Sequence, residues 1–342
     1  MMWRLCGIAV VFGLGLVLAG LGPLDGTLPI ASAHQAAKGK PQPSGQLETV
    51  VLYDPAVGEL PEGIAVDKVG NLFVTLAPLG QIRKITPDGS ETIFATLDPA
   101  IFQPAVGAIG LAVDAPGNVY ACLMSLNPAT HGVWRISRDG YFKERLPGTE
   151  QILFPNALAF DKVGNLYVTD LVMGAVWRIP PDGVAEIWVQ DPLLEGNGSL
   201  GLGLPLGANG IVYRHGEILV ANTEGGRIVR IQVLGDGTAG APEVIVEEPI
   251  LYPVDGIAMD VHGNIYAVTS TGMLLRISFD GGSIDVLATA ADGLDEPASL
   301  AFGTGKGNRK NIFFTNFAFL QNGGAGPSVM KISVGVSGLP LP

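Results

Sequence analysis

The segment Asp255-Gly256-Ile257-Ala258-Met259-Asp260 recurs along the chain with small variations. Five further copies, at spacings of 43 to 53 residues, cover 62–67, 109–114, 156–161, 209–213 and 298–302. Each copy precedes a turn, a short apolar strand and a third strand that ends in Arg-Ile or Lys-Ile. A unit of four short strands repeated at this period is the sequence pattern of a β-propeller blade. We therefore expect an all-β chain of six four-stranded blades.

The sixth unit ends near Ser333 without residues for a fourth strand. A strand-like segment, Leu47–Tyr53, precedes the first unit. We expect this N-terminal strand to complete the last blade, because the pairing closes the ring and removes an open sheet edge. The Gly-Asn and Asp-Gly pairs between strands are turn formers that need positive φ, so we assign them no chemistry.

The composition of the 342 residues suits an all-β chain with a large core. Hydrophobic residues make up 47% and charged residues only 15%, and the 48 Gly and 25 Pro favour frequent turns over helices. The formal net charge of −12 argues against binding to nucleic acid and to anionic membrane surfaces, because both attract clustered Lys and Arg.

Residues 1–33 differ from the rest of the chain. A basic start, an apolar run over 5–21 and a small-residue end at Ala31-Ser32-Ala33 are typical of a secretory signal. We expect cleavage after Ala33 and a secreted or periplasmic protein; the alternative is an uncleaved segment that anchors the chain in a membrane. Residues 34–45 then form a flexible linker, and residues 46–342 form a single propeller domain.

The first strand of every blade lines the central channel, so equivalent residues of the six repeats lie at one height around the axis. The first residue of the repeat is an oxygen donor in four blades: Glu62, Asn156, Asn209 and Asp255. We call these four residues the oxygen column; Ile109 and Ala298 occupy its other two places. Asp and Asn also favour strand ends, but two carboxylates in a narrow channel repel each other unless a cation lies between them.

Two carboxylates and two amide oxygens suit a hard divalent ion such as calcium. The column contains no His or Cys, which zinc and copper prefer. We therefore predict that the oxygen column binds calcium as the cofactor of this protein.

Three segments resemble a known family: Pro61-Glu62-Gly63, Pro155-Asn156-Ala157-Leu158 and Asp255-Gly256-Ile257-Ala258. They look like the equivalent segments of the SMP-30/gluconolactonase/LRE-like family and of the related diisopropylfluorophosphatases and paraoxonases. The resemblance implies a six-bladed propeller with catalytic calcium and lactonase, esterase or phosphotriesterase activity. It implies metal ligands at Glu62, Asn209 and Asp255, with Asn156 as a ligand in some members and a substrate contact in others. The chain departs from the family at Phe154, where sugar-lactone hydrolases carry Arg, and at Ile109, where paraoxonase-like members often carry His.

Four side chains do not saturate calcium, so positions remain for substrate and water. A substrate carbonyl or phosphoryl oxygen would be polarised there. Asp255 is the candidate catalytic residue, either as a general base toward water or as a nucleophile. Polar residues that end second strands, and one histidine in a blade-2 loop, are candidates for the rim of the substrate site: Asp170, Asn222, Ser270, Asn316 and His131. Cys122 also ends a second strand, but it suits a small core residue better than a nucleophile.

The long loops on the face of the column favour a neutral, apolar small-molecule substrate. These loops, at 98–108, 123–131, 190–208 and 316–327, carry Leu, Met and Phe and lack Lys and Arg. A sugar acid or phosphate monoester would find no cationic clamp there. The sequence thus predicts an exported calcium-dependent hydrolase of a lactone or ester bond, with phosphotriesters as a further option.

Two other functions compete with this prediction. The first is a non-catalytic propeller of NHL type that binds a partner and keeps calcium for structure. The second is a strictosidine-synthase-like enzyme that uses the same fold without metal, against which the oxygen column argues.

Overall fold

The computed structural model describes residues 45–97, 107–320 and 324–341. The predicted signal segment 1–33, all of the linker except Gly45, and parts of the loops at 98–108 and 316–327 lie outside the described residues. No helix among the described residues is long and apolar enough to span a bilayer.

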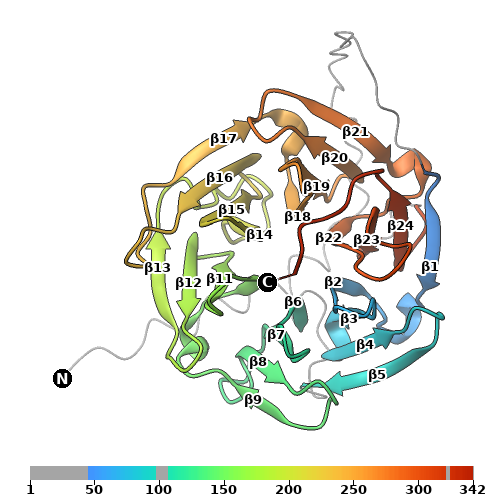
Figure 1. Ribbon diagram of the computed structural model, residues 1–342, viewed down its shortest axis with the longest axis horizontal. Coiled ribbons are helices and arrows are strands. Elements are labelled where there is room, and N and C mark those ends of the chain that lie inside the picture. The colour runs from blue at the N-terminus through green and yellow to red at the C-terminus, as the bar shows by residue number, and fades with distance from the viewer. Residues whose placement is uncertain (1–44, 98–106, 321–323, 342) are drawn as a thin grey trace.

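Six four-stranded antiparallel sheets surround a central axis, which confirms the predicted six-bladed propeller (Figure 1). The first three blades are β2 (Pro61–Val66), β3 (Leu72–Leu76), β4 (Gln81–Ile85) and β5 (Glu91–Thr96); β6 (Ala108–Val113), β7 (Val119–Leu123), β8 (Gly132–Ile136) and β9 (Lys143–Arg145); β10 (Pro155–Phe160), β11 (Leu166–Asp170), β12 (Ala175–Ile179) and β13 (Glu186–Gln190). The next two are β14 (Ala208–Arg214), β15 (Glu217–Asn222), β16 (Arg227–Gln232) and β17 (Glu243–Glu247); β18 (Val254–Met259), β19 (Ile265–Thr269), β20 (Met273–Ile277) and β21 (Ile284–Thr289). Within the described ranges, the connections contain five short 3₁₀ turns: η1 (Pro55–Val57), η2 (Ala77–Leu79), η3 (Thr149–Gln151), η4 (Pro249–Leu251) and η5 (Ala290–Asp292).

The sixth blade closes the ring in the predicted way. It contains β22 (Pro297–Phe302), β23 (Asn311–Asn316) and β24 (Ser328–Ser333), and its outermost strand is β1 (Glu48–Leu52). Glu48 lies opposite Lys331 in the antiparallel ladder, and their side chains form an ion pair of 2.8 Å. The N-terminal strand therefore covers the edge that β24 would otherwise leave open.

The six first strands touch one another in ring order, and apolar residues fill the spaces between neighbouring blades. Tyr167 of β11 is fully buried and packs edge-to-face on Trp188 of β13. Tyr266 of β19 makes the same type of contact with Phe302 of β22. Because each blade buries its two faces against its neighbours, the ring holds the first strands in fixed positions around the axis.

The repeated Asp and Asn after the first strand build a turn. Asp161 accepts hydrogen bonds from the backbone N–H of Val163 and from both the backbone and the side chain of Asn165, at 2.7 to 2.9 Å. Asp260 and Asn264 repeat this arrangement in blade 5. These residues are used for the backbone of the turn, and they lie at the opposite end of the first strand from the oxygen column.

The C-terminal segment runs back to the axis (Figure 1). The N–H of Val261 donates to the carbonyl of Ser337 at 3.0 Å, and the N–H of Leu339 donates to the carbonyl of Met259 at 3.1 Å. Leu339, Pro340 and Leu341 line a cavity of about 200 Å³ together with apolar residues of all six first strands. The tail thus covers the end of the channel that is opposite the oxygen column.

Candidate metal centre

The strand register places the oxygen column on one face of the disc, which we call the column face. In every blade, the residue before the column position pairs with a residue at the end of the second strand, as Pro155 pairs with Asp170 and Ala208 with Asn222. The pairing then shifts at the column residue and its successor, so all six first strands carry a β-bulge at the same place. A bulge changes the direction of its side chains relative to the regular pleat, which is the condition for several side chains to converge on the axis.

The second residue of each bulge is small because the neighbouring blade lies against it. A Cβ atom on Gly63 would lie 2.2 Å from the carbonyl oxygen of Ile109, and one on Gly110 would lie 2.1 Å from that of Asn156. Gly210 meets the carbonyl oxygen of Asp255 in the same way, at 2.5 Å. The glycine after each of these column residues is therefore a packing requirement of the ring.

Threonines of the second strands connect these bulges around the ring. The Thr75 hydroxyl accepts from the N–H of Gly63 and donates to the carbonyl of Ile109, both at 2.7 Å. The Thr315 hydroxyl donates to the carbonyl of Glu62 at 2.5 Å, across the junction between the last blade and the first. These hydrogen bonds hold the column backbone in place. The sequence analysis missed them, although Thr recurs at this strand position in three blades, as Thr75, Thr169 and Thr315.

Glu62 and Asp255 are half-buried side chains of like charge. Burial raises the pKa of Glu62 well above its usual range, and the neighbouring Asp255 carboxylate raises it further. Burial also raises the pKa of Asp255 to about 7, although the side-chain hydrogen bond from Asn209 acts in the opposite direction. The Oε2 atom of Glu62 is buried and has no hydrogen-bond partner among the described residues. An unpartnered oxygen beside a second carboxylate is a poor site for a negative charge unless a cation compensates it.

The two amides of the column are also buried, with Asn156 7% and Asn209 5% exposed. Asn209 donates through Nδ2 to the Thr223 hydroxyl at 3.0 Å, which fixes the plane of its amide. No group of three or more His, Cys, Asp or Glu side chains that could hold a metal occurs in the described part of the chain, so a metal at the column would depend on its two amides as well as its two carboxylates. The donor set of two carboxylates and two neutral oxygens, with one orphaned carboxylate oxygen, fits a hard divalent cation.

Three of the predicted rim residues are fully buried and hold loop backbones. Asp170 accepts from the N–H groups of Leu153, Phe154 and Met173 at 2.7 to 3.1 Å. Asn222 donates to the carbonyls of Leu193 and Glu195, and Asn316 donates to the carbonyl of Gly293. These side chains lie beside the column. Their polar atoms are hydrogen-bonded mainly to the segments that connect the preceding blade to their own blade. Ser270 lies just after β19, where its N–H donates to the carbonyl of Pro253.

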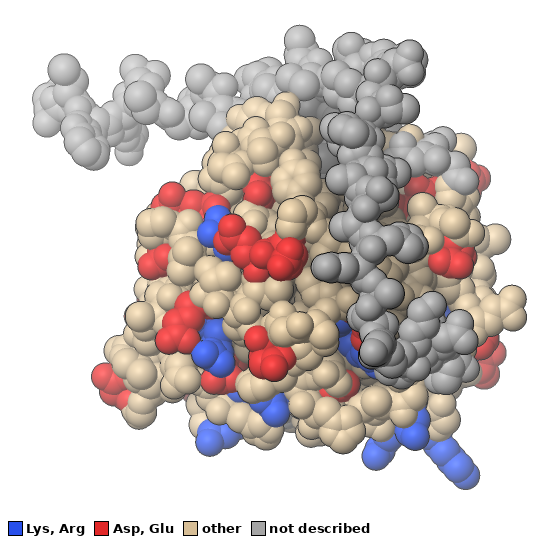
Figure 2. Space-filling view, turned by 90° about the horizontal axis from the view of Figure 1, so that it is seen from above, with Lys and Arg blue, Asp and Glu red and all other residues tan. Residues whose placement is uncertain are grey.

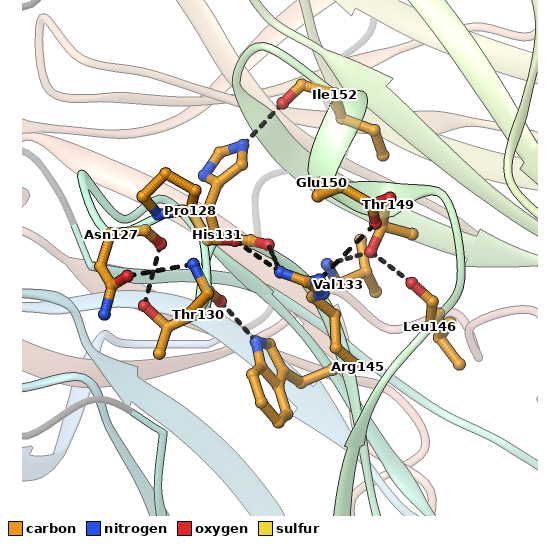
Figure 3. Close-up of polar contacts among 12 residues, drawn as sticks. Asn127, Pro128, Thr130, His131, Val133, Arg145, Leu146, Thr149, Glu150 and Ile152 are labelled. Carbon is orange, nitrogen blue, oxygen red and sulfur yellow. Dashed lines mark hydrogen bonds and ion pairs between the residues drawn. The ribbon is translucent and has the colours of Figure 1, made fainter.

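His131 is held by hydrogen bonds at both ring nitrogens, and Figure 3 shows the contact between its ring and Ile152. Nδ1 accepts from the N–H of Ser125 at 3.2 Å, and Nε2 lies 2.7 Å from the carbonyl oxygen of Ile152. This pairing places the proton on Nε2 and leaves no free lone pair for a base. Arg145 fixes the same loop by donating to the carbonyls of Pro128 and His131 (Figure 3).

Cys122 is a free thiol in the core, as expected. Burial raises the pKa of this thiol well above its usual value, and the nearby Glu62 carboxylate acts in the same direction. The thiol form is therefore the stable one at neutral pH, and a thiolate nucleophile is disfavoured.

Comparison with known proteins identifies similar folds. No protein-family model and no curated protein sequence matches this chain. Among solved structures, a gluconolactonase from Xanthomonas campestris is 18% identical, with a TM-score of 0.62, over 85% of this chain and 90% of that one. A luciferin-regenerating enzyme is 14% identical, with a TM-score of 0.65, over 87% and 98% of the two chains. The calcium-binding protein regucalcin from Agrobacterium tumefaciens is 14% identical, with a TM-score of 0.64, over 88% and 97%. The expected resemblance to SMP-30/gluconolactonase-like propellers is thus confirmed in the fold.

Proposed function

We propose that this chain is an exported calcium-dependent hydrolase that opens a lactone or cleaves an ester of a neutral, apolar substrate. The observation that carries the proposal is the oxygen column, in which two half-buried carboxylates of like charge interact and the buried Oε2 atom of Glu62 lacks a hydrogen-bond partner within the described ranges. The similarity to a gluconolactonase and to a calcium-binding regucalcin supports the same reaction class and the same cation. A fold alone does not define a reaction, so the proposed activity rests on the oxygen column.

Glu62, Asn156, Asn209 and Asp255 would hold the calcium ion. When bound, calcium supplies a Lewis acid that polarises a carbonyl or phosphoryl oxygen of the substrate. Asp255 is the residue of this set that accepts a proton from water or attacks the substrate carbon itself. Its carboxylate is oriented by the Asn209 amide, which is in turn fixed by Thr223. The hydrogen bonds that the Thr75 and Thr315 hydroxyls make to the column backbone keep the column residues in position during the reaction.

The charges of the column face support an uncharged substrate. Arg145 and Arg227 are near this face, but Arg145 donates to loop carbonyls and Arg227 pairs with Glu247 at 3.2 Å. In the edge-on view of Figure 2, most visible Lys and Arg atoms lie in the lower half, whereas Asp and Glu also occupy the upper half. A substrate with a carboxylate or phosphate would therefore meet repulsion without a free cationic partner. The half-buried Leu202 and Leu204 of the blade 3 to blade 4 loop offer apolar contact instead.

The proposal is tested with the mature protein, 34–342. Calcium binding is measured by titration calorimetry, and hydrolysis is measured on a series of γ-lactones with alkyl chains of rising length, on aryl esters, on a phosphotriester and on an anionic aldonolactone. We expect calcium to bind, turnover of the apolar lactones or esters, and loss of turnover with a chelator. Calcium binding without turnover of any substrate would favour the non-catalytic, partner-binding propeller. Turnover that survives the chelator would refute the role of the column.

A further inference from the structure

The loop between β13 and β14 contains a compact Ω-loop over residues 196–207. Its two ends touch: a Cβ atom on Gly207 would lie 2.6 Å from the nitrogen of Gly196, and one on Gly196 would lie 2.3 Å from the nitrogen of Leu206. No larger residue fits at either end. Loops of this length with adjoining ends form compact units that often carry function. This one lies on the column face, directly before Asn209.

The Ω-loop is organised around one buried carboxylate, that of Glu224, which is only 4% exposed. Its Oε2 accepts from the N–H groups of Asn197 at 2.7 Å, Gly198 at 2.5 Å and Leu206 at 3.1 Å. Its Oε1 accepts from the N–H of Leu200 at 3.0 Å. Four backbone donors thus replace water around this charge, and no ion pair to Glu224 occurs within the described ranges. A neutral side chain could not accept all four of these hydrogen bonds.

The same turn of the chain also fixes the oxygen column. Asn222 donates to the carbonyls of Leu193 and Glu195, and these hydrogen bonds hold the segment that directly precedes the loop. Thr223 accepts from the side chain of Asn209 and donates its N–H to the carbonyl of Gly207. Three consecutive residues, Asn222, Thr223 and Glu224, therefore hold the loop base, a column amide and the loop itself. The position of the loop is tied to the position of the column.

The outer part of the loop presents apolar side chains without regular packing. Leu200, Leu202 and Leu204 are half-buried and alternate with Gly201 and Gly203, which have positive φ and no atom within 4 Å of a Cβ position. The Ser199 hydroxyl lies 3.3 Å from the hydroxyl of Tyr252, which belongs to the segment that leads into Asp255. The loop thus extends from blade 4 toward blade 5, between the strands that carry Asn209 and Asp255.

We propose that residues 196–207 are the loop that selects the apolar part of the substrate, and that Glu224 is the positioning residue that holds this loop over the column. This inference rests on the proposed hydrolase function, because it assigns the acyl or alkyl group of that substrate to Leu200, Leu202 and Leu204. Burial of each added methylene group against the leucines increases kcat/KM by about fourfold.

The test compares Glu224→Gln with Glu195→Gln, a matched control that removes the same charge from an exposed side chain of the same connection. Hydrogen exchange of the peptide that covers 196–207 is read without substrate, and kcat/KM is read along the γ-lactone series. We expect Glu224→Gln to raise exchange in this peptide at least tenfold and to reduce the gain per methylene group to below twofold. The control should change neither quantity, and calcium should still bind to both proteins. Equal exchange in the two variants would refute the role of Glu224.

A second variant, Leu202→Ala combined with Leu204→Ala, examines the selecting surface without touching Glu224. We expect a reduced gain per methylene group, retained calcium binding and native exchange outside the loop. An unchanged chain-length preference in this variant would show that the loop does not contact the substrate. If the wild type hydrolyses no member of the series, the hydrolase function and the selecting role fail together, while the exchange experiment still decides whether Glu224 orders the loop.

Discussion

Replacing Glu62 by Gln should stabilise the metal-free protein and weaken calcium binding. Gln keeps nearly the same volume, but it removes one of the two half-buried negative charges and places a neutral group at the position of the unpartnered Oε2 atom. The shift of Asp255 from its usual pKa to about 7 sets the scale, since it corresponds to roughly 4 kcal/mol for one ionised carboxylate at this place. We expect metal-free Glu62→Gln to gain about 2 to 4 kcal/mol at pH 8. Its calcium affinity should fall by about 100-fold or more, because half of the compensating charge is lost.

The sign of the pH dependence follows from the same shift. The folded metal-free protein holds a proton on the column more tightly than the unfolded chain does, so its stability falls as pH rises from about 4 to about 7. The difference between wild type and Glu62→Gln should be small at pH 4 and should grow as the pH rises, because the pKa of Glu62 is raised well above its usual range. Urea unfolding with a chelator, at pH 4, 6 and 8, measures it. A variant that is less stable than wild type at pH 8 would refute the reasoning, because it would mean that the carboxylate is already compensated in the metal-free fold.

Further predictions concern the catalytic group, the bulge and the ring closure. Asp255→Asn should lower kcat by at least about 1,000-fold and should leave the circular dichroism spectrum unchanged. Single turnover of the wild type in ¹⁸O water distinguishes the two roles of Asp255, since ¹⁸O enters the protein only if Asp255 attacks the substrate. Gly63→Ala should destabilise the protein by about 3 kcal/mol in urea unfolding, because its Cβ would lie 2.2 Å from the carbonyl oxygen of Ile109, and an unaffected midpoint would show that the bulge can relax. Deletion through Tyr53 should expose the edge of β24 and cause aggregation, whereas deletion through Gly45 should not; equal melting curves would mean that β1 is dispensable.

The blades and the column positions could be read from the sequence because a propeller repeats them. Equivalent residues in a repeat occupy equivalent places, so aligning Glu62 with Asp255 identified their common height without any knowledge of contacts. Ring closure was accessible for a similar reason, because the last repeat lacked a strand and the N-terminus offered one. The structure confirms the six blades and the closure of the ring by the N-terminal strand.

The roles of individual polar residues could not be read in this way. Asp170 and Asn222 align with each other at the strand ends, but their partners lie in blade connections, which differ in length from blade to blade. His131 faces the column side in the sequence pattern, yet its ring nitrogens are used by Ser125 and Ile152. Glu224 escaped notice because a single acidic residue after a strand carries no signal until its four backbone donors are seen. Hydrogen bonds within irregular loops depend on backbone geometry that periodicity does not encode.

The two ends of the channel differ, because the C-terminal tail covers one end and the oxygen column lies at the other. The C-terminal tail lies over the end opposite the oxygen column, where Leu339 is hydrogen-bonded to Met259 and a Cβ atom on Gly338 would lie 2.2 Å from the ring of Phe302. The apolar space beneath the column is thus lined partly by the protein's own C-terminus. A substrate that reaches Asp255 then approaches from the column face, past the Ω-loop at 196–207. Since Thr223 holds Asn209 and its neighbour Glu224 holds this loop, calcium affinity has to be measured beside kcat/KM in variants of these two residues, so that a change in selectivity is not mistaken for a change at the column.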